Sequence, residues 1–121
     1  AESAMVARWS ASVPEQYHPF VVPPEHGAHV QTRWFELTST GARGLRVDAD
    51  RPVRVSARRH HDAALTAAST IAELSEGETT EVHVDMAMRG LGTGACGPDT
   101  RPDYLGRPGV HTWSWSLRPR C

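Results

Sequence analysis

Short stretches in which apolar and polar residues alternate are the feature that most constrains how this chain can fold. They occur at residues 45–48, 53–56, 82–88 and 111–117. Alternation with a period of two is typical of strands that bury one face, because successive side chains of a strand point to opposite sides. In the last stretch Trp113, Trp115 and Leu117 share one side. We therefore expect antiparallel sheet, with Trp113 and Trp115 in its core.

Proline and glycine separate these stretches and leave little room for helix. Four prolines fall within residues 14–24, where they favour extended chain. Residues 29–37 are rich in β-branched and aromatic side chains and are a further expected strand. Only residues 61–74 carry apolar side chains at helical spacing. The pattern predicts an all-β chain, an antiparallel β-sandwich with at most one short helix.

Length, charge and cysteine content limit the classes of function. With 121 residues we expect a single domain over residues 14–121, after a lead-in or linker at residues 1–13. The net charge of -1 predicts no nucleic-acid partner and, with no apolar run of about 20 residues, no membrane partner. Cys96 and Cys121 are expected to be free thiols in a reducing, cytoplasmic compartment.

Two motifs suggest ligands but lack the context that those ligands need. Residues 92–97 match G-x-G-x-x-G, yet Pro98 and Pro102 follow where a dinucleotide site needs a helix. We interpret the glycines as a loop that can approach another group closely. Seven histidines are present, but the adjacent His60 and His61 would point to opposite faces of an extended segment. No metal site and no cofactor are predicted in this chain.

Catalytic side chains are not recognisable in the sequence either. A glycosidase needs two carboxylates on either side of the scissile bond. The acidic residues at 73–81 cluster around a turn, where a solvated surface is the ordinary interpretation, and no Gly-x-Ser-x-Gly motif occurs. Trp34 fits either core packing or stacking against a sugar. We expect the chain alone to be inactive.

The order and spacing of several motifs are similar to those of one enzyme family. Residues 21–27 and 32–34 carry the first of them, and the similarity continues at 69–74, Asp85, 90–92, Tyr104 and 113–119. Together they resemble the C-terminal domain of glycoside hydrolase family 2 β-galactosidases, the small-chain or domain 5 part. The resemblance implies a galactose-mutarotase-like supersandwich, of which this chain is about the last half.

The resemblance also implies where the chemistry lies. The parent would be a retaining β-galactosidase with both catalytic glutamates in a barrel outside this chain. Parent enzymes of the family also often use Mg and Na ions, at sites outside this chain. Relatives carry a sugar-stacking Trp on the Gly-rich loop, and Cys96 or Gly97 takes its place here. The substrate-rim loop would comprise five residues: Gly92, Gly94, Cys96, Gly97 and Asp99. Polar contacts would come from Glu25, His26 and Arg33.

The resemblance predicts a non-catalytic C-terminal domain of a β-galactosidase, which scaffolds the enzyme and shapes the rim of the galactoside site. Its partners would be the galactoside substrate, the remaining domains of the same polypeptide and, in a homo-oligomer, further copies. Two other interpretations stay open: a free-standing carbohydrate-binding module, and a structural or interaction β domain of an unrelated protein.

Overall fold

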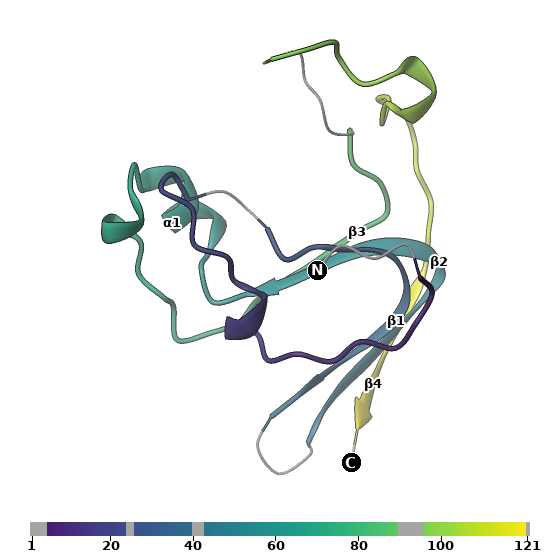
Figure 1. The fold of residues 1–121 in the computed structure, drawn as a ribbon. Coiled ribbons are helices and arrows are strands. Elements are labelled where there is room, and N and C mark those ends of the chain that lie inside the picture. Colours follow the sequence, from purple (N-terminus) through teal and green to yellow (C-terminus); the bar gives the residue numbers. More distant parts are fainter. Residues whose placement is uncertain (1–4, 24–25, 40–42, 90–95, 121) are drawn as a thin grey trace. The chain divides into compact units, whose positions relative to one another are not determined.

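The structure is a computed structural model that describes residues 5–23, 26–39, 43–89 and 96–120. Its strands are β1 (His29–Thr38), β2 (Gly44–Arg58), β3 (Glu81–Asp85) and β4 (Trp115–Arg120). One α-helix, α1 (Asp62–Ala67), and three single-turn 3-10 helices, η1 (Pro14–Gln16), η2 (Ile71–Glu73) and η3 (Pro102–Tyr104), complete the described elements (Figure 1). The all-β antiparallel class with one short helix is confirmed.

The long strand β2 organises the sheet. β1 pairs with β2 antiparallel along one edge, and β3 is the neighbour of β2 on the other side. β4 pairs antiparallel with the first part of β2, from Gly44 opposite Arg120 to Ala49 opposite Trp115. Since β1 and β4 both pair with that part of β2, they lie on its opposite edges. β2 runs without a break from Gly44 to Arg58, so the stretches 45–48 and 53–56, expected as two strands, are parts of one strand.

The pairing of β1 with β2 is irregular in the middle. The register shifts between His29 and Thr32 and again between Thr32 and Trp34. Gln31 lies within the first shift and has a φ of 57°, the left-handed region that side chains other than glycine rarely adopt. Such a residue is typical of a β-bulge, which bends a strand and interrupts its ladder.

Contacts divide the described chain into two compact units, which we describe separately. Unit 1 comprises residues 1–27 and 56–82, and unit 2 comprises residues 28–55 and 83–121. The expected lead-in at residues 1–13 and single domain at 14–121 stay predictions. Among the described residues no helix is long and apolar enough to cross a membrane.

In unit 2, apolar and polar residues alternate along β1, β2 and β4, so the sheet that these strands form has one apolar face and one charged face. Eight side chains share the apolar face, namely Phe35, Leu37, Leu45, Val47, Ala49, Trp115, Leu117 and Pro119. Val47, at the middle of this face, is 5% exposed. Towards β4 the face opens, because Leu45 is 41% exposed and Trp115 and Leu117 are each 51% exposed.

The predicted burial of the two C-terminal tryptophans is therefore only partly right. Trp113 is half-buried, but Trp115 is exposed. The strand also begins later than expected, at Trp115 rather than at residue 111. Alternation establishes that one face of β4 is apolar, but it does not establish that other residues of the same chain cover that face. The prediction that Trp115 belongs to the core is wrong for this chain.

Unit 1 holds the short helix and two of the 3-10 turns. Helix α1 begins at Asp62 and ends at Ala67, in an alanine-rich stretch where intrinsic helix propensity is high. The expected helix at 61–74 is thus confirmed in its first part, while η2 forms the second. The backbone N–H of Ile71 donates to the carbonyl of Val21 at 3.1 Å and joins η2 to the N-terminal segment.

Candidate functional site

The loop after β3 was the predicted functional element, and the structure describes its two ends. Gly92 and Gly94 lie outside the described residues. Cys96 is exposed with a free thiol, and a Cβ at Gly97 would meet none of the described atoms within 4 Å.

An ion pair joins the two ends of this loop. The guanidinium of Arg89 donates to both carboxylate oxygens of Asp99, at 3.1 and 2.9 Å. The backbone N–H of Thr100 also donates to Asp99, at 2.7 Å. Arg89 and this N–H together lower the pKa of the Asp99 carboxyl to about 2. Asp99, predicted as a substrate-rim residue, is thus a partner of Arg89 that closes the base of the loop.

The predicted polar contacts are distributed over both units. Glu25 lies outside the described residues. Arg33 is an exposed residue of β1 in unit 2. His26 is half-buried in unit 1, where its ring lies 4.6 Å from that of Tyr17 and 5.8 Å from that of Phe20. Burial among these rings lowers the pKa of His26 and favours its neutral form.

Tyr17 lies between two histidines of unit 1. Its ring centroid is 4.5 Å from that of His60, which is 6% exposed. His60 in turn accepts a hydrogen bond on its carbonyl from the Arg58 guanidinium, at 2.9 Å. The tilted rings and the buried arginine form a packed polar cluster in unit 1, and the predicted polar contact of His26 with substrate stays a prediction.

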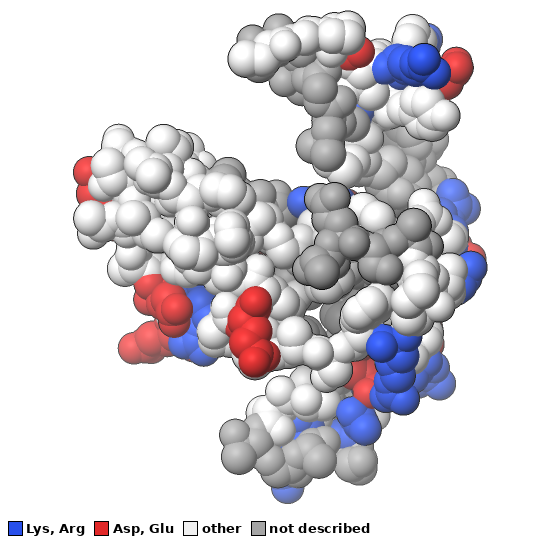
Figure 2. Space-filling view, in the orientation of Figure 1, with Lys and Arg blue, Asp and Glu red and all other residues white. Residues whose placement is uncertain are grey.

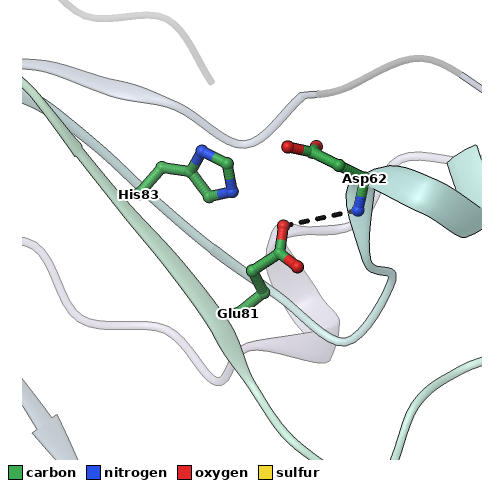
Figure 3. Close-up of side chains that lie close together, drawn as sticks. All are labelled: Asp62, Glu81 and His83. Atoms are coloured by element: carbon green, nitrogen blue, oxygen red, sulfur yellow. Dashed lines mark hydrogen bonds between the residues drawn. The ribbon is translucent and has the colours of Figure 1, made fainter. Parts of the chain in front are cut away.

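Acidic side chains of unit 1 converge on the same arginine. Arg58, only 6% exposed, donates to the carboxylates of Asp62 and of Glu81, the latter at 3.0 Å. Glu81 also accepts from the backbone N–H of Asp62 at 3.3 Å, the contact drawn in Figure 3. Its second oxygen lies 2.7 Å from Nδ1 of His61. Arg58 supplies the positive charge that these carboxylates need.

The charged face of the unit 2 sheet is a ladder of ion pairs. Arg46 binds Glu36 at 3.3 Å and Asp48 at 2.8 Å, and Arg118 binds Asp48 at 2.5 Å. The two guanidinium groups lower the pKa of Asp48 to about 2. Arg46 also lies 4.3 Å from the ring centroid of Trp34. One face of Trp34 is therefore occupied by a cation, which favours packing over sugar stacking for this residue.

Mixed charge also characterises the molecular surface. On the face that Figure 2 shows, blue and red atoms lie in small mixed groups rather than in one large area of either sign. The mixture of signs on this face agrees with the net charge of -1.

Sequence reasoning missed an open groove of about 450 Å³ in unit 2. One wall consists of residues 84–89, which lead into the loop, and the other of Gly106, Arg107, His111 and Trp113, which follow it. The walls meet where the N–H of Gly106 donates to the carbonyl of Arg89 at 3.3 Å. The available signal was the aromatic and methionine content of two segments on either side of a Gly-rich loop.

Two comparisons with known proteins bear on this site. The family described as beta-galactosidase small chain matches residues 1–117. A β-galactosidase from Arthrobacter sp. (strain B7) is 36% identical over 122 residues, which cover 96% of this chain and 12% of that relative. The chain thus spans about an eighth of the length of the curated relative that it matches.

Proposed function

Because the chain belongs to the β-galactosidase small-chain family, we propose that it is a non-catalytic C-terminal part of a glycoside hydrolase family 2 β-galactosidase. In this proposal it is one part of a mutarotase-like sandwich, and a retaining pair of glutamates in a barrel outside the chain performs the hydrolysis. The enzyme is a cytoplasmic homo-oligomer, and its Mg and Na ions bind outside this chain.

The open apolar face of unit 2 carries this proposal. Trp115 and Leu117 are each 51% exposed, beside Leu45 at 41%. Large contiguous apolar patches are uncommon on soluble monomers and usually mark an interface. Trp115 has Ala49 opposite it and Leu117 on the same face, and these neighbours offer no hydrogen-bonding side chain to a sugar. We therefore assign the face to another part of the same enzyme rather than to a carbohydrate.

The ionic contacts of the carboxylates support a non-catalytic role. Asp85 is bound by Arg54 at 2.5 Å and Asp99 by Arg89 at 2.9 Å. A general acid in a glycosidase needs a raised pKa, whereas Arg89 lowers the pKa of Asp99 to about 2. The contribution of this chain to substrate binding would then come from the loop after β3, with Cys96 and Gly97 exposed at its described end.

A chimera tests the proposal. The matching segment of the Arthrobacter β-galactosidase is replaced by this chain, and hydrolysis of a chromogenic β-galactoside is measured. We expect the chimera to be active, and both the relative lacking that segment and this chain alone to be inactive. Turnover by the purified 121-residue chain would contradict the proposal.

Two variants of the chimera separate the proposed interface from a general effect of charge. Leu117→Asp introduces a charge into the apolar face and should abolish assembly and activity. Val110→Asp introduces the same charge at a side chain that is 98% exposed and should be tolerated. Equal activity of the two variants would show that the apolar face is not an interface.

A further inference from the structure

The N-terminal segment of unit 1, by which we mean residues 14–27 apart from 24 and 25, folds back on itself at a glycine. Gly27 has a φ of 75°, and a Cβ there would lie 2.9 Å from the carbonyl oxygen of Gln16. Both the left-handed backbone and the close approach favour a residue without a side chain. This turn brings the ring of His26 to 4.6 Å from that of Tyr17.

Two contacts attach the N-terminal segment to the rest of unit 1. The ring of Tyr17 lies 4.5 Å from that of His60, a buried residue just after the end of β2. The carbonyl of Val21 accepts from the N–H of Ile71 at 3.1 Å. The hydroxyl of Tyr17 is buried, and among the described residues it has no hydrogen-bond partner. A buried hydroxyl without a partner weakens the attachment of the segment.

The closed arrangement requires the neutral form of His26. The backbone N–H of His18 donates to the ring of His26, 3.3 Å from Nδ1 and 3.2 Å from Nε2. A neutral imidazole has one nitrogen that can accept this bond, whereas in the imidazolium both nitrogens carry protons and neither can accept. Protonation of His26 therefore replaces a hydrogen bond with two donors that face each other.

The surroundings of His26 also disfavour a positive charge on its ring. Burial is the largest cause that lowers its pKa, and the charges of His18, His60 and Arg58 lower it further. His18 belongs to the same segment, whereas Arg58 ends β2 and His60 follows it. Only the backbone carbonyl of Gln16, which accepts from the ring, acts in the opposite direction among these groups.

Two carboxylates of unit 1 lie close to the same arginine but are directed away from His26. Asp62 and Glu81 both accept from the guanidinium of Arg58. Glu81 also lies 2.7 Å from Nδ1 of His61. These carboxylates are thus bound to other basic groups of the unit.

We propose that the N-terminal segment is closed on His60 at neutral pH and opens when His26 takes up a proton in mildly acidic solution. Opening separates Tyr17 from His60 and exposes the buried ring of His60. The inference goes beyond the proposed function and does not rest on it, because every contact involved lies within unit 1 of this chain.

Hydrogen exchange followed by NMR tests the proposal on the 121-residue chain. The reporters are the N–H groups of His18 and Ile71, which donate in the closed arrangement. The ordinary pKa of His26 is 6.5 and lies lower in the closed segment, so the closed form loses stability as the pH falls below about 6.5. Between about pH 7.5 and about pH 5.5, the protection factors of both reporters should fall by up to about tenfold.

An internal reference separates local opening from acid unfolding of the whole chain. The N–H of Asp50 donates to the carbonyl of Ser114 at 3.0 Å in unit 2, and its protection factor should stay constant over the same range. Constant protection of the reporters, or an equal fall at Asp50, would overturn the proposal.

A substitution assigns the effect to one histidine. His26→Gln takes up no proton but keeps an acceptor and a donor, so its reporters should be equally protected at both pH values. His111→Gln is the matched control, since His111 is exposed in unit 2, and this variant should behave as the wild type does. A pH effect that persists in His26→Gln would refute the role of His26.

A second measurement keeps the proposal testable if His26→Gln does not fold. In the wild type, the Cε1–H resonance of His26 reports its protonation, and nuclear Overhauser effects between the rings of Tyr17 and His60 report the closed arrangement. The two titrations should share one midpoint, below the ordinary value of 6.5. Protonation of His26 with the ring contacts intact, or loss of these contacts without protonation, would contradict the proposal.

Discussion

Replacing Trp115 with Ala should have a cost that depends on what covers the apolar face. A tryptophan side chain buries up to about 200 Å² when it is fully covered. Trp115 is 51% exposed, so roughly 100 Å² is covered within this chain. At about 25 cal/mol per Å², the substitution should lower the free energy of unfolding of the isolated chain by about 2–3 kcal/mol. The exposed half of the Trp115 side chain contributes a comparable free energy only when a partner covers it. We therefore expect Trp115→Ala to lower the stability of the chimera by about 5 kcal/mol.

Urea denaturation followed by circular dichroism, at low protein concentration, measures how much Trp115→Ala lowers the free energy of unfolding of the isolated chain. Thermal inactivation compares the stability of the chimera variants. Val53→Ala is the matched control, because Val53 is 3% exposed and its cost of about 2 kcal/mol should be the same in both proteins. If Trp115→Ala costs the same in the dilute chain as in the chimera, the face is not covered by the parent enzyme. A cost near 5 kcal/mol in the dilute chain would mean that this face is already buried in solution.

The remaining predictions concern the charged face and the loop. The pKa of Asp48 lies at about 2 in the folded chain against an ordinary 3.8, so its stabilising effect is present above the ordinary value and is lost as the pH falls towards 2. Thermal melts from about pH 5 to about pH 2 should therefore decline less steeply for Asp48→Asn than for the wild type, and equal slopes would disprove the assignment. Gly106→Ala should cost about 1–3 kcal/mol in urea denaturation, because its Cβ would lie 2.8 Å from the carbonyl oxygen of Met88; Gly97→Ala, with open space around it, should be neutral, and the reverse order would contradict the structure. Cys96 is exposed and should react with a thiol reagent in the folded chain as fast as in urea; strong protection without urea would show that the loop is covered.

The strands were predictable from sequence because alternation is a local property. The patterns at 45–48 and 53–56 located β2, although they did not reveal that the strand continues between them through residues such as Asp50 and Arg51. The alternation at 82–88 located β3, which ends at Asp85. Pairing with β2, rather than pattern alone, determines where each strand stops.

Exposure and long-range contacts were not predictable in the same way. Trp115 was assigned to the core because apolar faces are usually covered, but the residues that would cover it are not among those described here. The ladder of Glu36, Arg46, Asp48 and Arg118 depends on the register of three strands, which single-strand patterns do not determine. The groove depends on two irregular segments that a hydrogen bond at Gly106 brings together, and no sequence period marks such a contact.

The ion pair between Arg89 and Asp99 has a consequence for how the loop of this chain can change in sequence. The length of a loop whose ends are held together has little effect on the stability of the sheet. The entropy of loop closure grows only with the logarithm of loop length, about 0.6 kcal/mol for a doubling. Insertions, deletions and changes of side chain between Arg89 and Asp99 are therefore inexpensive for folding. The sequence of the segment that holds Cys96 and Gly97 can therefore change without a change in the sequences of the strands. New ligand contacts can be selected in this segment.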